Sequence, residues 1–212
     1  FFLMMKSIAT KAMLAAGAAS VAMSAVSAPA EAFSLKTYTD RTTWEADLNT
    51  NGFFASPTEM FDNNKSNAPS ITFYNGVTST SNSFQQIAEG VYNADAENLS
   101  TTMTEIQWQF PTLTQGFGAY FSDVDPVDNQ DPQDPRGLQV IIGNHPAILI
   151  GSEISGNGFF GVIADSAFSS LTFKNSDTGR NDNFSVDDLS FAEPIPTPAL
   201  LPGLVEIGRA HV

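Results

Sequence analysis

Apolar and polar residues alternate along most of the chain between residues 104 and 191. In Thr104–Phe110 the apolar side chains are Ile106, Trp108 and Phe110, and Gly116–Phe121 follows the same rule. A period of two residues is that of a β-strand with one buried face. Further short runs of this kind occupy Leu138–Ile142, Ala147–Ile150, Gly158–Ala164, Ser169–Phe173 and Phe184–Phe191. Such runs, spaced roughly 8–12 residues apart with Gly, Asn and Asp between them, are typical of a β-sandwich or barrel.

Turn residues predict where some of these strands end. Gly143–Pro146 predicts a hairpin turn between two of the runs, and the Asn-Gly pair at 75–76 predicts a turn after a strand at Ile71–Tyr74. Residues 63–70 and 79–95 show no clear pattern, so we expect long loops there.

One short helix is predicted near the start of the domain. Asp40 can cap a helix over Arg41–Leu48, because its carboxylate can accept hydrogen bonds from the first free backbone N–H groups. Trp44 and Leu48 then lie one turn apart and face the core. The Asn-Gly pair at 51–52 ends the helix.

Composition and charge narrow the classes of partner. The chain has 212 residues, which suits one domain with sorting segments at its ends. Its formal net charge of −14 argues against nucleic acid and against an anionic membrane surface, since both partners are negatively charged. The lack of Cys excludes disulfides, thiolate metal sites and Cys nucleophiles. Between residues 33 and 205 there are 21 acidic and 6 basic residues, and this acidic excess favours divalent cations as counterions.

The aromatic residues predict a Phe-rich core. Fifteen of the 17 Phe follow residue 32, mostly at alternating strand positions. Exposed platforms that stack on sugars more often use Trp and Tyr, so this composition weakens the case for glycan binding. Five aromatic residues remain candidates for such a platform, although we expect a structural role for each: Trp44, Tyr74, Tyr92, Trp108 and Tyr120.

The first 32 residues have the features of an export signal. Lys6 and Lys11 form a short basic region, and Ala12–Val26 is uncharged, small and apolar. Ala30 and Ala32 fit the small-x-small pattern of a signal peptidase site, so we predict cleavage before Phe33. The nearest alternative site ends at Ala30. A membrane anchor is the other interpretation, but this Ala-rich run is only weakly apolar.

A second sorting signal lies near the other end of the chain. Residues 192–205 form a Pro-rich linker and the sequence Pro196, Thr197, Pro198 and Ala199, followed by apolar residues. This stretch resembles the start of a PEP-CTERM-type sorting tail in its PTPA-CTERM variant. The resemblance implies a transmembrane helix and a basic cluster after the motif, processing by an exosortase-type enzyme, and only transient membrane contact through that helix. It also implies a destination at the cell surface or extracellular matrix of a bacterium with a Gram-negative-type envelope.

The chain departs from this family after Val205. Residues 206–212 complete no membrane helix and contain no basic cluster. They back-translate to a sequence that resembles a common sequencing-library adapter, so we interpret them as an artefact of read-through. The parent gene is then expected to continue with apolar residues and to end in basic ones.

The body of the chain also resembles a recurrent domain of exported PEP-CTERM proteins. The matching pieces are Tyr38–Arg41, Gly116–Asp123, Gly158–Ile163 and Asp187–Phe191, the last being similar to the closing strand of lectin-like jelly rolls. We therefore predict an all-β, mainly antiparallel, jelly-roll-like β-sandwich over residues 33–191. It carries one short N-terminal helix and follows a signal-peptide helix.

An acidic stretch makes calcium the one candidate cofactor. Five carboxylates fall between residues 123 and 134, and Asp123 and Asp125 can present two of them at the mouth of one loop. By resemblance to lectin-like sandwiches, Asp187 or Asp188 of the final strand is the candidate partner in a structural Ca²⁺ site. The alternative is a solvated acidic loop that binds no metal.

The remaining motifs do not indicate catalysis. The G-x-G-x-x-G match at Gly156–Gly161 lies before a strand, whereas a dinucleotide site needs a helix there. His145 lies in a tight turn, and no nucleophile elbow accompanies it. We therefore expect a non-catalytic exported surface or matrix protein with polysaccharide contact as its activity. The alternatives are a structural envelope or biofilm component without a ligand, and a small extracellular glycan hydrolase, for which paired carboxylates cannot be located from sequence.

Overall fold

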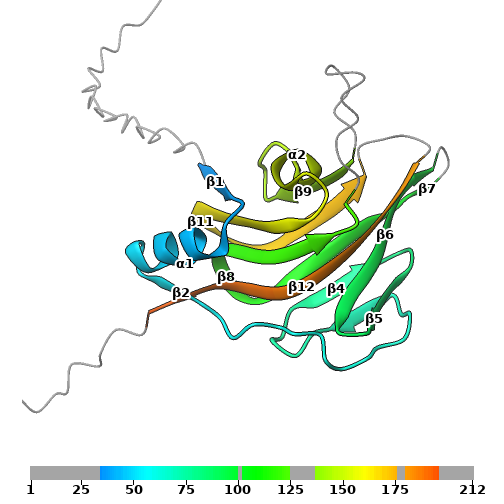
Figure 1. Ribbon diagram of the computed structural model, residues 1–212, viewed down its shortest axis with the longest axis horizontal. Helices are drawn as coiled ribbons and strands as arrows, with labels where there is room; N and C mark the ends of the chain where they lie inside the picture. Colours follow the sequence, from blue (N-terminus) through cyan, green and yellow to red (C-terminus); the bar gives the residue numbers. More distant parts are fainter. Residues whose placement is uncertain (1–33, 100–101, 125–136, 176–179, 196–212) are drawn as a thin grey trace, which may run out of the picture. The chain divides into compact units, whose positions relative to one another are not determined.

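The computed structural model describes residues 34–99, 102–124, 137–175 and 180–195. The predicted signal segment, Asp125 and the sorting motif at 196–199 lie outside these ranges. Twelve strands and two helices follow one another in this order: β1 (Leu35–Tyr38), α1 (Arg41–Thr50), β2 (Phe53–Ala55), β3 (Ser70–Thr72), β4 (Thr78–Ser81), β5 (Gln85–Ala88), β6 (Val91–Leu99), β7 (Thr102–Met103), β8 (Glu105–Ser122), β9 (Leu138–Ile142), β10 (Ile148–Leu149), α2 (Ile150–Ile154), β11 (Gly158–Asn175) and β12 (Arg180–Pro194). All strand pairs are antiparallel, and the predicted all-β, sandwich-like fold with an N-terminal helix is confirmed (Figure 1).

Two long strands, β8 and β11, pass from one layer of the sandwich into the other. The first half of β8 pairs with β4 and the second half with β12. In β11 the first half pairs with β1 and the second half with β9. The strands pair with each other through both halves, with register shifts between Ile163 and Ser170. We call β3-β4-β8-β11-β9-β10 the first layer and β1-β11-β8-β12-β6-β5 the second layer.

The bend of β8 between the two layers changes which positions along the strand are buried. In the first half of β8 the side chains buried in the core are even-numbered, such as Trp108, and in the second half they are odd-numbered, such as Phe121, while Gly116 and Gly118 are buried on the opposite face under α1. A flat strand would keep one phase, so the change marks the bend. Separate strands were predicted on either side of each bend, and the structure joins them into single strands.

Aromatic rings from both layers fill the core. The ring of Trp108 lies 4.8 Å from that of Phe173 and 5.8 Å from that of Tyr92, measured between centroids. The Tyr92 hydroxyl lies 2.9 Å from Ser79 Oγ and donates to Gln85 Oε1 at 3.0 Å. Burial raises the pKa of Tyr92 well above its usual range, so this hydroxyl stays protonated.

Helix α1 packs against the outer surface of the second layer. Asp40 Oδ1 accepts a hydrogen bond from Thr43 N at 2.8 Å and caps the helix as predicted. Trp44 and Leu48 are fully buried, and Trp44 Nε1 donates to the carbonyl of Val162 at 3.0 Å. The α1 helix therefore covers the β8 and β11 part of this surface and leaves open β6, β5 and the part of β12 that pairs with β6 (Figure 1).

Glycines form the floor on which Trp44 rests. Gly118 and Gly161 are cross-strand partners on β8 and β11. A Cβ on Gly118 would lie 2.5 Å from the ring of Phe159, and one on Gly116 would lie 2.6 Å from the carbonyl oxygen of Val162. Any larger residue would therefore push the helix or the neighbouring strand away.

Two local predictions are wrong. Residues 79–95 were expected to form a loop, but they contain most of β4, all of β5 and the start of β6. The buried face of β6 holds Tyr92, Ala94 and Ala96, and the two alanines fill a crowded core but give a weak hydrophobic signal in the sequence.

A second helix replaces part of a predicted strand. The run Ala147–Ile150 forms only the short strand β10 before α2 begins at Ile150. The predicted turn before it is present, with His145 N donating to the carbonyl of Ile142 at 3.0 Å. At the other end, β12 continues to Pro194 and pairs with β2, so the first residues of the predicted linker belong to the sheet.

Replacing Gly116 by Ala is expected to lower the free energy of unfolding by roughly 1–3 kcal/mol, because the new methyl group meets a backbone carbonyl that cannot move alone. Urea denaturation measures the change. Ser122→Ala, a partly exposed position on the same strand, is the control and should change stability by less than about 0.5 kcal/mol. Equal stability of the two variants would contradict the close contact.

Candidate functional site

The open part of the second layer carries a row of neutral polar side chains on its outer face. Gln86 on β5 pairs with Asn93 on β6, which in turn pairs with Ser185 on β12, and Ser185 pairs with Ser122 on β8. Their neighbours in sequence, such as Tyr92 and Phe184, are buried. The strand period therefore turns this row to the solvent. We call it the polar row.

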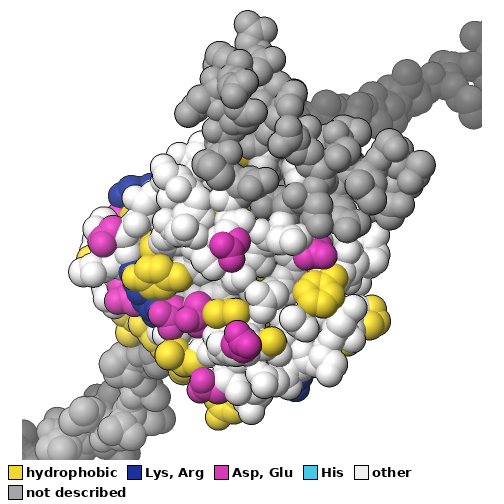
Figure 2. Space-filling view, turned by 45° about the vertical axis from the view of Figure 1, so that its right-hand side comes forward, with side chains coloured by type: hydrophobic (Ala, Val, Ile, Leu, Met, Phe, Trp, Pro, Cys, Tyr) yellow, Lys and Arg dark blue, Asp and Glu magenta, His cyan; other side chains and the backbone are white. Residues whose placement is uncertain are grey.

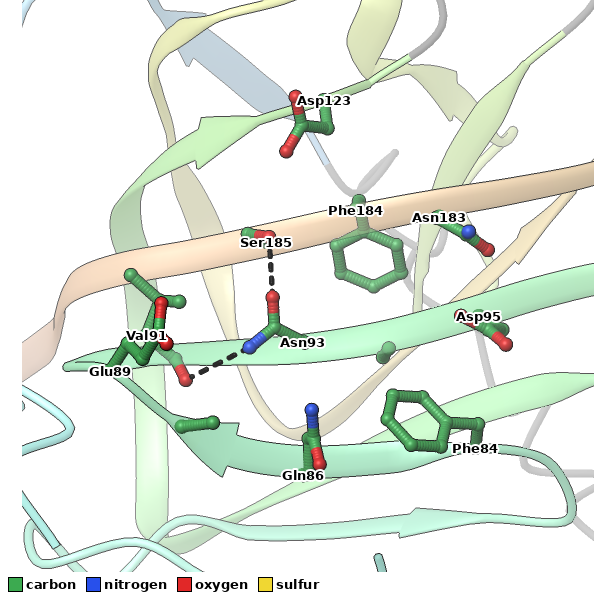
Figure 3. A pocket seen from close by; sticks show the side chains of 12 residues that line it. Phe84, Gln86, Glu89, Val91, Asn93, Asp95, Asp123, Asn183, Phe184 and Ser185 are labelled. Carbon is green, nitrogen blue, oxygen red and sulfur yellow. Dashed lines mark hydrogen bonds between the residues drawn. The ribbon is translucent and has the colours of Figure 1, made fainter. Parts of the chain in front are cut away.

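A shallow hollow of about 440 Å³ lies over the polar row. Figure 3 shows Gln86 and Asn93 beneath the β12 strand that carries Ser185, with Phe84 and Asn183 at one side. The lining residues come from β5, β6, β12 and the segments beside them: Phe84, Gln86, Ala88, Glu89, Val91, Asn93, Ala94, Asp95, Asp123, Asn183, Phe184 and Ser185.

Hydrogen bonds hold the centre of the row. Ser185 Oγ donates to Asn93 Oδ1 at 2.8 Å, and Asn93 Nδ2 donates to the carbonyl of Val91 at 3.4 Å (Figure 3). These contacts fix the plane of the Asn93 amide. A fixed amide next to hydroxyl groups presents both donors and acceptors to a bound molecule.

Aromatic rings border the polar row. Phe84 lines the hollow with a partly exposed ring. Tyr120, on the same outer face of β8, is 41% exposed. Its ring lies 5.5 Å from that of Phe159, which lies 5.7 Å from that of Trp44. The helix thus supports the position of Tyr120 through two ring contacts.

The five aromatic candidates divide into two groups. The expected structural role is confirmed for the three fully buried ones, Trp44, Tyr92 and Trp108. For Tyr74, which is 88% exposed in the turn between β3 and β4, and for the half-exposed Tyr120, it stays a prediction, and both rings are accessible to a ligand.

The hollow is acidic. Glu89, Asp95 and Asp123 are among its lining residues, and no Lys, Arg or His is among the lining residues that the structure describes. In the space-filling view of the domain, acidic side chains lie among apolar ones and basic side chains are few (Figure 2). Such a surface repels anionic polymers and accepts uncharged or cationic ones.

The structure does not bring Asp123 together with the final-strand acids. The backbone N–H of Asp123 donates to Asn157 Oδ1 at 2.9 Å, just beyond the pair formed by Ser122 and Ser185. Asp187 pairs with Tyr120, so it lies about 10 Å further along the strand, at ~3.3 Å per residue. Within the described ranges no group of three or more acidic or His side chains could hold a metal ion. Because Asp125 lies outside those ranges, the calcium site stays a prediction.

Asp187 and Asp188 instead take part in a bulge of β12. Asp188 N donates to Asp187 Oδ1 at 2.7 Å, and Arg41 Nη1 donates to the carbonyl of Asp188 at 3.3 Å. Arg41 Nη1 also lies 4.0 Å from Asp188 Oδ2. Burial raises the pKa of Asp187, and the charges of Asp188 and Asp62 add to this, while the Asp188 N–H lowers it.

The polar row was not predicted from the sequence. Gln86 and Asn93 fall in residues 79–95, where no strand was expected. The available signal was the alternation of polar residues with Ala and Tyr in Val91–Ala96, which appears only if Ala counts as a core residue.

No protein-family model, curated protein or solved structure matches the chain. Of the helices in the described part of the chain, none has the length and apolar character needed to cross a membrane.

Replacing Asp187 by Asn is expected to stabilise the domain near pH 7. Because folding raises the pKa of Asp187, the unfolded chain loses this proton first as the pH rises, and stability falls from about the ordinary pKa of 3.8 upwards. Asn keeps an oxygen for the Asp188 N–H and removes the charge. The gain should stay below about 1 kcal/mol, since the carboxylate is partly exposed and screened by water.

Thermal unfolding between pH 3 and pH 8 checks this effect. The Asp187→Asn variant should melt roughly 2 °C above the parent at pH 7 and level with it at the acidic end. Glu89→Gln, at an exposed carboxylate in the turn between β5 and β6, is the matched control. An advantage of Asp187→Asn that persists unchanged at low pH would show that charge is not its cause.

Proposed function

We propose that this domain is a non-catalytic carbohydrate-binding module that holds a neutral polysaccharide chain in the hollow over the polar row. The observation that carries the proposal is the alignment of Gln86, Asn93 and Ser185 across three strands on an open face. Amide and hydroxyl groups in one line can exchange hydrogen bonds with successive sugar hydroxyls.

The borders of the hollow support a sugar ligand. The ring of Phe84 and the half-exposed ring of Tyr120 offer flat apolar surfaces for the C–H face of a sugar. The hollow is shallow, whereas a site for a small molecule would enclose most of its ligand. An extended polymer that lies across the strands suits this shape better.

The charge of the face supports an uncharged ligand. Glu89, Asp95 and Asp123 would repel uronic acids and sulfated sugars. An uncharged chain meets no such repulsion. The calcium site predicted at Asp123 and Asp125 would contribute by ordering the loop beside the hollow, and not by contacting the sugar.

The two sorting signals support a site of action outside the cell. The export signal at residues 1–32 would engage signal peptidase, and the motif at 196–199 would engage an exosortase-type enzyme. The domain would then act at the cell surface or in the extracellular matrix, where polysaccharide is abundant.

A glycan hydrolase is the second candidate, and the perturbed Asp187 favours it. A carboxyl group with a raised pKa can serve as a general acid, provided that a second carboxylate faces it across the substrate. Asp187 lies beside Asp188, which contacts Arg41, and both are on the same strand. Asp188 is therefore not positioned across a substrate from Asp187, as a hydrolase would require, and this arrangement supports binding more than bond cleavage.

Retention on immobilised polysaccharides tests the proposal. The full chain should be retained on a neutral β-glucan or mannan and pass through alginate. Gln86→Ala should weaken retention about tenfold, since one or two hydrogen bonds to the sugar are lost. The control, Gln115→Ala, changes a partly exposed Gln near the bend of β8 and should bind normally.

Repeating the experiment in EDTA separates the role of calcium. A loss of retention supports a calcium site that includes Asp123 and Asp125, and unchanged retention removes calcium from the proposal. Failure to bind any polysaccharide in either buffer would favour the purely structural envelope component. Release of reducing ends from the matrix would favour the hydrolase.

A further inference from the structure

The outer face of the first layer carries a regular array of uncharged polar side chains. One cross-strand row runs Thr72, Thr78, Gln109 and Ser170, and the next runs Ser70, Thr80, Gln107 and Thr172. Each row crosses β3, β4, β8 and β11. We call these two rows the hydroxyl-amide array.

The array follows from the strand period. Every side chain of the array is exposed or partly exposed. On each of the four strands the residue between the two array positions, such as Trp108 on β8 or Leu171 on β11, is buried. Neighbouring strands lie ~4.8 Å apart, and alternate residues lie ~6.7 Å apart along a strand. The hydroxyl and amide groups thus repeat on a small grid, and none carries a charge, although the chain has a net charge of −14.

Features at both ends of the array suit a polymer that extends beyond it. At one end a hollow of about 420 Å³ is lined by Thr80, Gln107 and Thr172 together with Ser81, Asn82 and one charged residue, Glu105. At the other end Tyr74, in the turn between β3 and β4, is 88% exposed, and Leu113 is 66% exposed. A sugar ring that leaves the grid can therefore meet an aromatic or apolar side chain.

Charge and polarity point to the class of partner. A second protein copy would need an apolar centre in its interface, and the array has none. Nucleic acid and acidic polysaccharides are disfavoured by the net charge. Neutral polysaccharide matches the array, because its hydroxyls both donate and accept hydrogen bonds.

The array and the polar row lie on the outer faces of opposite layers. Gln107 and Ser122 belong to the same strand, β8, but to the halves on either side of its bend. A chain bound at one face leaves the other accessible. We propose that the array is a second polysaccharide site and that one domain crosslinks two polysaccharide chains, an inference that rests on the proposed function.

Turbidity of a long neutral β-glucan mixed with the full chain tests the crosslinking. The parent protein, confirmed as a monomer by size-exclusion chromatography, should produce turbidity that short oligosaccharides of the same glucan reverse. Gln107→Ala combined with Thr172→Ala should raise the concentration for half-maximal turbidity at least tenfold, while retention on immobilised glucan falls only partly. Gln86→Ala, acting from the other face, should raise the concentration for half-maximal turbidity by a similar factor, and the three substitutions together should abolish both readouts.

The outcomes separate the two proposals. If the array variant crosslinks like the parent, the second site is wrong and the polar row can still stand. If Gln86→Ala alone abolishes retention, the polar row is the sole site and the inference also fails. If Gln86→Ala binds normally and the array variant loses all retention, the polar row is wrong as the site. Thermal midpoints within about 2 °C of the parent show that each variant is folded.

Discussion

The antiparallel pairing of β8 with β11 is the constraint on which the rest of the structure depends. Each strand is 18 residues long, and the two stay together through the bend that separates the layers. The first half of β8 and the second half of β11 therefore form the centre of the first layer, and the other two halves form the centre of the second layer. Each of the other described strands pairs with β8 or β11, either directly or through a neighbouring strand, so this pair determines the position of that strand in its layer.

The bend also sets the chemistry of the two outer faces. Because the buried phase of β8 changes at the bend, the residues on its outer face are Gln107 and Gln109 in one half and Gly118, under α1, and Tyr120 in the other. The first half contributes to an uncharged polar grid. The second half contributes a glycine floor for α1, and the neighbouring strands β12, β6 and β5 complete the polar row. One strand thus supports two surfaces of different character.

The sequence predicted the elements whose signals are strong. The capped helix with Trp44 and Leu48, the turn at Asn75-Gly76 and the strands rich in Phe and Ile all appear, because each depends on a local rule. The strands β5 and β6 were missed because their inward positions hold Gln85, Tyr92, Ala94 and Ala96, which are polar or weakly apolar yet buried. Their burial depends on packing across the layers, which a local pattern does not report.

The same limit applies to the candidate site. The acids Asp123, Asp187 and Asp188 were visible in the sequence, but their separation along β12 depends on the register with β8. The polar row depends on registers among four strands. Gln86 and Ser185 belong to no sequence motif, so only their alignment across the strands identifies them as candidate binding residues.

The closing of the sheet by its first strands has a consequence for how the domain folds. β1 pairs with β11 and β2 pairs with the end of β12, so the earliest residues of the domain meet the latest ones. Pairs that are so distant in sequence form slowly, because a long loop must close before they gain any contact. A chain emerging from the ribosome therefore cannot complete this sheet until Pro194 is available.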